Sequence, residues 1–490
     1  MRITIVLGCL FCCTMPIALA QIIPIKTVPL ATGSQFSIFP SAHMASGGVS
    51  IATDDELLDP FTNPAKGYSV EGLRVLSAPQ MYSVSMERGT GEGSGRSLPL
   101  GVLMKNGDMF GGLYWARQEL SESRNSVSGV TPGFHGIPAF SDDPENNTYT
   151  YAMLGTAIPG MNMVIGASAM WGELNSVEGV NLLFPRSPKV LQNGSLAQYR
   201  VGITRAMEDD QQFDAVLVRS VFKMRYDVGS FMTFMDSRMV QEVQFNPEYD
   251  QTNLWGLELK YTRPLADNFR LGALLTTNWK EHPKIPNYDL MSVPRDPGNS
   301  TAYNLGLGLH KSVDYSYFAV DLIYEPITTM TWAEADQSIP LSNGDVFPAG
   351  MRTVENFFNF SNWIGRIGFR AGTTASAFQA GLRIHAISYD LEQINHIQRS
   401  KRNQSENWAE WTISAGYGFS VGPARVLYTG LLTMGTGQPG VVSAGWSGTA
   451  RSGVTDAFSA GDFLPAPSGS LNIREALIWT HMVSISYRIE

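Results

Sequence analysis

The chain has 490 residues, of which 43% are hydrophobic and only 16% are charged, and it contains 48 glycines. Globular chains usually carry charge on about a quarter of their residues, so this composition does not suit a charged helical protein. Acidic residues outnumber basic ones by 44 to 35, which argues against nucleic acid as a partner. Beyond the first twenty residues no stretch holds about 18 consecutive strongly apolar side chains, so membrane-spanning helices are not expected.

The first twenty residues have the features of an export signal. Arg2 supplies a positive start, residues 3–13 are apolar, and residues 18–20 form a small-x-small cleavage site. We therefore predict a signal peptide over 1–20, with Gln21 as the first residue of the exported chain. All three cysteines lie in this segment, so the exported chain can have neither a disulfide bond nor thiol chemistry.

Residues 21–78 lack the alternation of strands and are rich in small residues. They contain the motif residues Gly47, Gly48, Asp54, Asp55, Asn63 and Pro64. A Gly-Gly pair, an acidic pair and an Asn-Pro-Ala turn in this order resemble the start of the long-chain fatty acid transporter (FadL-like) family and its PorV-like relatives. That family carries Gly-Gly-Ala-x-x-Ala-x-x-Asp-Asp followed by Asn-Pro-Ala-Gly-Leu. Val49 and Lys66 depart from the family pattern.

The resemblance implies an N-terminal hatch, or plug, inside a monomeric 14-stranded barrel that takes up hydrophobic molecules by diffusion. The six motif residues would then belong to the hatch or to a ligand site. The residues themselves are compatible with this, because a wide barrel has an open lumen unless a segment fills it. A Gly-rich backbone can also approach inward side chains closely. A periplasmic linker is the alternative for 21–78.

Residues 79–490 are expected to form the barrel, because their apolar side chains recur with period two. The clearest segments are 222–228, 303–310, 318–325 and 411–420. Seven short turns lie near 105–108, 158–161, 207–212, 264–268, 311–315, 370–375 and 421–424. Long polar connections alternate with them, near 119–147, 175–195, 229–253, 280–300, 327–361, 390–407 and 434–473. Outer-membrane barrels have this asymmetry of short periplasmic turns and long extracellular loops.

The hairpins also give a strand count. Seven hairpins with a first and a last strand make 16 strands, while the family has 14. We therefore predict an all-β fold, a transmembrane antiparallel barrel of 14 to 16 strands, with 14 slightly preferred. The amphipathic final segment, from Trp479 to Ile489, would pair with the first strand, near 81–87, to close the barrel.

Most tryptophans fall near the strand ends that face the long connections. An aromatic girdle at the membrane surface explains this placement, because amphipathic rings prefer that boundary. The girdle is predicted to contain Trp115, Trp171, Trp255, Trp279, Trp332, Trp363, Trp408, Trp411 and Trp479, and only Trp446 falls inside a long connection.

Charged side chains on the strands are expected to point into the lumen, because Arg or Lys facing lipid at mid-depth costs about 2–4 kcal/mol. The residues assigned to the lumen are Arg200, Lys223, Arg225, Arg366, Arg370, Arg383 and His385. Two roles are open for them. They could form ion pairs with Asp54, Asp55 and other hatch acids, or they could steer an anionic head group.

The sequence holds no nucleophile–base arrangement and no histidine pair at metal spacing, so no catalytic residue, metal or cofactor is expected. The expected function is passive passage of hydrophobic or amphipathic small molecules, fatty-acid-like or aromatic, across the outer membrane of a Gram-negative bacterium. Outer-membrane lipid or lipopolysaccharide and a hydrophobic small-molecule ligand are the expected partners, and the barrel is expected to be a monomer. Two alternatives remain: a protein-interaction barrel resembling the PorV-like shuttle of type IX secretion, and a structural barrel without transport.

Overall fold

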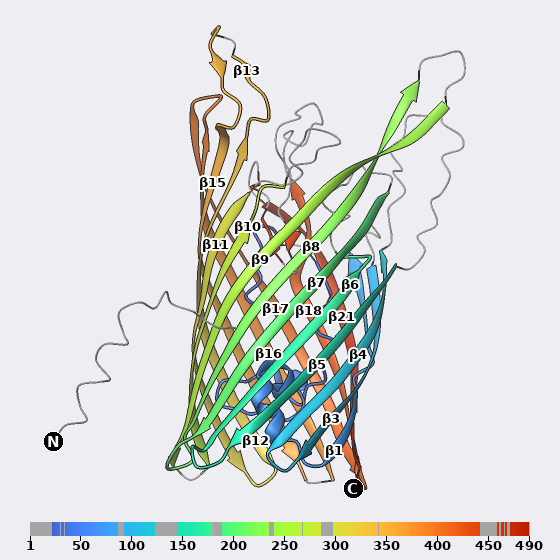
Figure 1. Ribbon diagram of the computed structural model, residues 1–490, viewed down its shortest axis with the longest axis vertical. Coiled ribbons are helices and arrows are strands. Elements are labelled where there is room, and N and C mark those ends of the chain that lie inside the picture. Colours follow the sequence, from blue (N-terminus) through green and yellow to red (C-terminus); the bar gives the residue numbers. More distant parts are fainter. Residues whose placement is uncertain are drawn as a thin grey trace, which may run out of the picture.

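A computed structural model describes residues 22–29, 31–33, 35–86, 93–122, 145–178, 180, 189–234, 240–266, 268–285, 297–341, 343–373, 375–441, 458–459, 462–464, 466–467 and 471–489. The signal peptide predicted over 1–20, Gln21 and Trp446 lie outside these residues. Within them, a tall closed barrel of antiparallel strands surrounds an N-terminal segment, whose helical turns lie in the lower half of the lumen (Figure 1).

The barrel wall is one sheet of 17 hydrogen-bonded stretches. They are β1 (Leu73–Ser77), β2 (Gln80–Met86), β3 (Gly93–Asn106), β4 (Met109–Glu122), β5 (Glu145–Ile158), β6 (Met163–Leu174), β7 (Val190–Ala206), β8 (Gln212–Phe234), β9 (Val240–Ala266), β10 (Phe269–His282), β11 (Gly298–Val313), β12 (Ser316–Glu334), β15 (Arg352–Gly372), β16 (Ser376–Asn395), β17 (Ser400–Val421), β18 (Ala424–Val441) and β21 (Leu471–Ile489). Two separate small sheets pair β13 (Ile339–Pro340) with β14 (Val346–Phe347), and β19 (Phe458–Ser459) with β20 (Asp462–Phe463).

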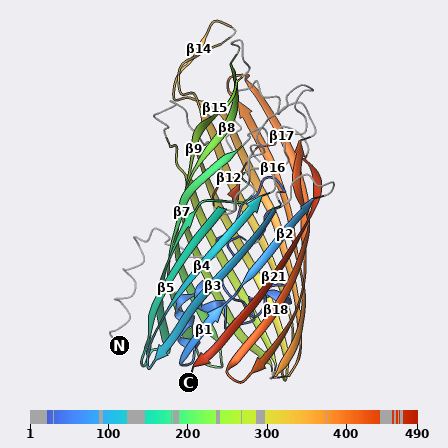
Figure 2. The same cartoon turned by 90° about the vertical axis from the view of Figure 1, so that its right-hand side faces the viewer.

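The stretches β1 and β2 are one barrel strand with an interruption at Pro79. Both keep the same register against β21, in which Leu73 lies opposite Ile489 and Gln80 lies opposite Met482. Proline has no N–H to donate, which breaks the ladder at this point. Its carbonyl still accepts a hydrogen bond from the N–H of Val483 at 2.9 Å. Counted in this way, the barrel has 16 strands and is closed where β21 meets β1 and β2 (Figure 2).

The predicted closed antiparallel barrel is confirmed, including the pairing of the last strand with the first. The slight preference for 14 strands is wrong, because all seven predicted turns join the two strands of a hairpin. The wall also begins at Leu73, so the expected boundary between 78 and 79 falls inside the first strand.

Three of the predicted long connections are largely strand. Segments 229–253, 327–361 and 390–407 contain the ends of six strands, and β9 alone has 27 residues. A tilted strand needs only about 9–11 residues to cross a bilayer, so these strands extend beyond it. Their polar composition suits strands that water surrounds, which is why they resemble loops in the sequence.

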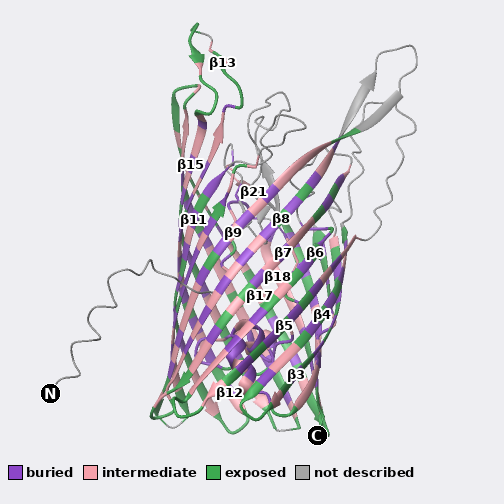
Figure 3. Ribbon diagram, in the orientation of Figure 1, coloured by how far each residue is buried: buried purple, intermediate pink, exposed green. Residues whose placement is uncertain are grey.

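The outer face of the wall carries the apolar side chains that a bilayer covers. Leu305, Leu307 and Leu309 of β11 are exposed, while Asn304, directly before them, is buried inside the barrel. The same alternation of exposed and buried residues runs along the strands in Figure 3. An outward apolar band with a polar interior is the arrangement of a transmembrane barrel.

The tryptophans largely follow this outer face. Trp115, Trp171, Trp255, Trp363, Trp411 and Trp479 are exposed on it, and Trp279 lies directly opposite Trp255 on the neighbouring strand. Trp408 is the exception, because it is 7% exposed and packs inside the lumen. Its assignment to the girdle is therefore wrong.

The plug comprises the described residues between 22 and 72. It contains only short helical turns, η1 (Met44–Ser46), α1 (Asp59–Thr62) and η2 (Pro64–Ser69). Phe61 of the plug is 2% exposed and stacks on Phe39 with 4.5 Å between ring centroids. Tyr114 and Tyr151 of the wall pack against the same ring, so the plug and the wall share one core. No helix in the described part of the chain is long and apolar enough to cross a membrane.

Candidate functional site

The Gly-Gly pair lies where the backbones of the plug and the wall approach each other closely. Gly47 and Gly48 both have φ of 70°, a left-handed conformation that favours glycine. A Cβ atom added to Gly381 of β16 would lie 2.0 Å from the Gly47 nitrogen, and one added to Gly368 of β15 would lie 2.4 Å from the Ser46 oxygen. The small residues of both partners therefore permit backbone-to-backbone contact between the plug and the wall.

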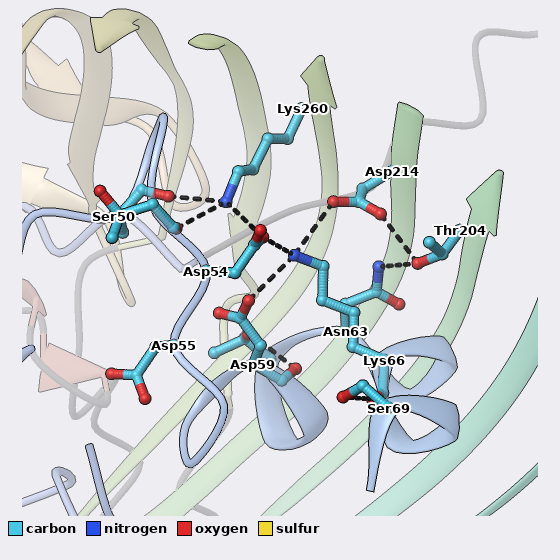
Figure 4. Close-up of polar contacts among 12 residues, drawn as sticks. Ser50, Asp54, Asp55, Asp59, Asn63, Lys66, Ser69, Thr204, Asp214 and Lys260 are labelled. Atoms are coloured by element: carbon cyan, nitrogen blue, oxygen red, sulfur yellow. Dashed lines mark hydrogen bonds and ion pairs between the residues drawn. The ribbon is translucent and has the colours of Figure 1, made fainter. Parts of the chain in front are cut away.

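Lys66 is the centre of an ion-pair network between the plug and the wall (Figure 4). Its Nζ lies 2.8 Å from Asp54, 2.9 Å from Asp59 and 3.2 Å from Asp214 of β8. Burial alone would lower the pKa of Lys66, but the carboxylates of Asp59, Asp214 and Asp54 outweigh it and hold the pKa well above its usual range. Lys66 is therefore a charged ammonium group at neutral pH.

Asp54 is held by the same network from the other side. Its carboxylate lies 2.6 Å from Arg270 of β10 and 3.9 Å from Lys260 of β9, in addition to Lys66. Burial raises the pKa of Asp54, but these three cations, with Lys66 first among them, bring it below its usual range. Lys260 also donates to the carbonyls of Ser50 and Thr53, at 2.6 Å and 3.2 Å.

The other motif residues shape the plug itself. The Asp55 carboxylate accepts hydrogen bonds from the N–H groups of Ala42, Leu57 and Leu58 at 2.9–3.0 Å. The side chain of Asn63 accepts from the N–H of Ala65 and donates to the hydroxyl of Thr204 on β7, both at 3.1 Å. Pro64 is the first residue of η2, where its missing N–H costs nothing. These residues have structural roles in the geometry seen here.

Five of the seven charged residues assigned to the lumen point into it. Arg366 donates to the Gly48 carbonyl at 3.2 Å and to Ser50 Oγ at 3.1 Å, and Arg200 donates to the Thr62 carbonyl at 2.8 Å. Arg370, Arg383 and His385 lie on the same inward faces of β15 and β16, and His385 Nε2 is 3.4 Å from Glu325.

Lys223 and Arg225 are the two that do not face the lumen, and their assignment is wrong. Both are exposed, while Phe222, Met224 and Tyr226 between and beside them are buried in the core that the plug shares with the wall. Arg219 of β8 lies opposite Trp255, which marks the predicted aromatic girdle. Lys223 and Arg225 follow Arg219 along β8, beyond the girdle, and so they lie in the part of the strand that water surrounds.

Arg366 and Arg383 form a like-charged pair above the plug. They lie directly opposite each other on β15 and β16. Arg366 reaches the plug. The guanidinium group of Arg383 is exposed in the lumen and has no hydrogen-bond or ion-pair partner among the described residues, although its charge acts on Glu410 of β17. Like charges directly opposite on a sheet destabilise it. Asp321 of β12 lies 3.8 Å from Arg366 and compensates that charge in part, so Arg383 is the member of the pair that a further anion would stabilise.

An aromatic cluster lies farther along the same strands, away from the short turns. It consists of Phe358, Phe360, Tyr389 and Trp408, all buried. Tyr389 lies 5.6 Å from Phe358 and 5.0 Å from Phe360 between ring centroids. The inward residues of β16 run in the order Gly381, Arg383, His385, Ile387 and Tyr389. Along the wall the order is thus an apolar aromatic surface, then the exposed charge of Arg383, then the contact with Gly47 of the plug.

The first described residues of the plug occupy this cluster. Ile23 and Ile25 are 1% and 0% exposed and pack among the aromatic rings. Tyr389 donates its hydroxyl to the Thr27 carbonyl at 2.9 Å, and Lys280 of β10 donates to the Ile23 carbonyl at 2.6 Å. The apolar side chains of the chain's own N-terminal segment therefore show that this surface accepts a hydrophobic occupant.

Sequence reasoning missed the residues that organise this lumen. Lys66 stood out only as a departure from the family motif, and Asp214 and Arg270 carried no signal because their partners lie far away in the chain. The aromatic cluster was equally hidden, since a buried Phe on a strand looks the same whether it faces a plug or lipid. Among the described residues, no three His, Cys, Asp or Glu side chains come together as a possible metal site.

No protein-family model matches the chain, and no curated protein matches it in sequence. The solved structures that resemble it include a toluene transporter of Ralstonia pickettii, TbuX, at 10% identity over 93% of this chain and 100% of that chain, with a TM-score of 0.42. A FadL homologue of Pseudomonas aeruginosa has 10% identity over 92% and 99% of the two chains and a TM-score of 0.45. The monoaromatic hydrocarbon channel CymD has 9% identity over 94% and 99%, with a TM-score of 0.41. Likenesses this distant carry no argument about what this chain does.

Proposed function

We propose that this protein lets hydrophobic or amphipathic small molecules cross the outer membrane of a Gram-negative bacterium by passive diffusion. The apolar outer belt would contact outer-membrane lipid or lipopolysaccharide, a monomeric barrel would suffice, and the segment over 1–20 would direct export. The plug would act as a hatch that closes the lumen until a solute passes.

One observation carries this proposal: the buried aromatic cluster lies beside the exposed guanidinium group of Arg383. Phe358, Phe360 and Tyr389 would hold an apolar body, and Arg383 would face an anionic end group. A site with an apolar wall and a few placed polar groups is typical of small-molecule binding. The N-terminal segment at Ile23 and Ile25 would have to move aside, which is a change confined to a few residues with no regular secondary structure around them.

Uptake in cells tests the proposal. A Gram-negative host without a related transporter would express the full chain and be given labelled naphthalene, a neutral hydrophobe, and labelled decanoate, an anionic amphipath. Phe360→Ala should lower the uptake of both compounds, because it removes an aromatic ring from the surface that they contact. Phe369→Ala is the matched control, since Phe369 lies on the same strand, is 44% exposed and faces outward. If the full chain gives no more uptake of either compound than an empty vector, transport is the wrong function.

A protein-interaction barrel is the second candidate, and one feature favours it. The strands β8 and β9 have 23 and 27 residues, well beyond the length that a bilayer needs, and so they present a large surface outside it. Co-purification of secretion components that depends on this hairpin, together with unchanged solute uptake after its shortening, would favour this candidate over transport.

A further inference from the structure

A cavity of about 450 Å³ lies between the plug and the wall at the end of the barrel with the short turns. The plug contributes Glu56 and Leu57 to it, and the wall contributes Arg74, Arg425 and Arg488. A second cavity of about 120 Å³ shares Ser420 and Arg425 with the first one and adds Arg370. We call these two adjoining cavities the exit pocket, because short turns mark the periplasmic end of such barrels.

The exit pocket concentrates positive charge in a way that a sheet ordinarily avoids. Arg74 of β1 and Arg488 of β21 lie directly opposite each other and both line the same cavity. Like charges placed in this way destabilise a sheet by several tenths of a kcal/mol or more. The arrangement is therefore a cost to the fold unless an anion lies between the two guanidinium groups.

The acids within reach do not match this charge. Glu56 of the plug is shared by Arg425 and Arg74, the latter at 3.6 Å, and Glu71 pairs with Arg488 at 2.6 Å from an exposed position. Arg370 has no carboxylate within ion-pair distance in the described part of the chain. The buried Asp55 carboxylate also acts on Arg425, but it already accepts hydrogen bonds from N–H groups of the plug. Four arginines thus face two glutamates and this one aspartate across the exit pocket and its rim.

Guanidinium N–H donors without an acceptor also indicate that the exit pocket suits an anion. Each guanidinium carries five N–H donors in a fixed fork that fits the oxygens of a carboxylate or a phosphate. The Nε atoms of Arg74 and Arg370 are buried and have no acceptor in the described residues. A buried donor without an acceptor costs free energy that a bound oxyanion would recover.

We propose that the exit pocket binds the oxyanion of a solute, a carboxylate or a phosphate, in competition with the carboxylate of Glu56. This inference rests on the proposed function, because it treats the pocket as the place where an amphipathic anion leaves the lumen. Glu56 already shows how one carboxylate sits there, held by Arg425 and Arg74. A solute carboxylate that replaces Glu56 breaks the ion pairs of Glu56 with Arg425 and Arg74, and so it releases this edge of the plug from the wall.

The competition links binding to the plug. An anion that displaces Glu56 weakens the contact of the plug with β18, and by reciprocity a plug that is held less tightly binds the anion better. The order along the wall agrees with this, since Arg366 and Arg383 face the lumen on one side of the Gly47 contact and Arg370 lies on the other.

Calorimetric titration of the detergent-solubilised full chain tests the proposal. The probes are sodium hexanoate, inorganic phosphate and 1-hexanol, which matches hexanoate in shape but has no charge. The titrations use an Arg383→Gln background, so that the lumen arginine does not contribute. Arg425→Gln should weaken hexanoate binding about tenfold, the value of one charge-assisted hydrogen bond, while leaving 1-hexanol unaffected. Arg96→Gln is the control, because Arg96 is 75% exposed on the outer face of β3 and should change nothing.

Glu56→Gln is the decisive variant, because it removes the competing charge and should tighten hexanoate binding several-fold. A merely structural role for the four arginines would give the opposite result, with a weakened plug and no gain in affinity. Tighter binding of phosphate than of hexanoate would identify a free phosphate or phospholipid head group as the source of the anion. The proposal is overturned if neither anion binds to the Glu56→Gln protein, or if Arg425→Gln leaves binding unchanged. Naphthalene uptake tests the proposed function separately. Normal naphthalene uptake by a protein whose exit pocket binds no anion would overturn this inference and leave the proposed function standing.

Discussion

Arg366 and Arg383 lie directly opposite each other on β15 and β16, but only Arg366 touches the plug. The two side chains therefore have different roles although they share one register position. Arg366 anchors the backbone of Gly48, and Arg383 leaves its charge free in the lumen.

Substitution of Arg383 with glutamine should separate charge recognition from stability. The change relieves like-charge repulsion across the two strands, so thermal stability should stay the same or rise slightly. Uptake of decanoate should fall about tenfold, the equivalent of one lost charge-assisted hydrogen bond, while naphthalene uptake stays unchanged. Equal losses for both compounds would show that Arg383 acts on the lumen as a whole and not on an anionic group.

Substitution of Lys66 with methionine should release the plug. Lys66 is 10% exposed, and its loss leaves three carboxylates close together without their shared cation. Breaking a buried ion pair from one side typically costs about 3–5 kcal/mol. The conductance of the purified barrel in planar bilayers should rise accordingly. Lys284→Met removes only a partly exposed pair with Glu334 at 2.8 Å and should cost under about 1 kcal/mol, with no change in conductance.

The same network predicts how the plug responds to pH. The pKa of Asp54 is lowered from 3.8, so its stabilisation is complete above that value and is lost only as the pH falls through the lower folded pKa. The pKa of Lys66 is raised above 10.5, so its stabilisation is complete below that value and is lost as the pH rises further. Asp59 contributes to stability with the opposite dependence on pH. Burial raises its pKa from 3.8, so its ionised form destabilises the fold and acidification removes this cost.

Plug closure, measured as conductance, should therefore be constant from about pH 5 to pH 9. Conductance should rise only outside that window. A step near pH 6.5 would contradict this account, because it would place the control of the plug in a histidine and not in the Lys66 network.

Alternation in the sequence shows which residues share a face, but it does not show what each face meets. In 303–310 and 318–325 the apolar face points outward, because lipid lies outside these strands and polar groups lie inside. In 222–228 the same reasoning reversed the faces. Phe222 and Tyr226 pack inward, and Lys223 and Arg225 stand in water beyond the girdle.

The candidate site was predictable only where it is local. The Gly-Gly and Asn-Pro motifs pointed to a plug over 21–78 through their resemblance to the FadL-like family, because such motifs lie close together in the sequence. The contact of Lys66 with Asp214 joins residues far apart in the chain, and the placement of Ile23 among aromatic rings depends on three distant strands. Such pairings follow from the closed barrel and have no periodic signal of their own.

The backbone contact between Gly381 of the wall and Gly47 of the plug gives a final prediction with an internal control. Gly381→Ala places a methyl group 2.0 Å from the Gly47 nitrogen, and neither backbone can move away easily, since β16 is paired on both sides. Such overpacking typically lowers the free energy of unfolding by about 1–3 kcal/mol. We expect the plug to be displaced while the strands of the wall stay paired. Gly365→Ala, on the neighbouring strand, meets nothing within 4 Å and should stay within about 0.5 kcal/mol of the parent. Limited proteolysis should cut the plug of the Gly381→Ala protein sooner while its barrel stays intact, and equal cleavage of both variants would show that this contact does not hold the plug.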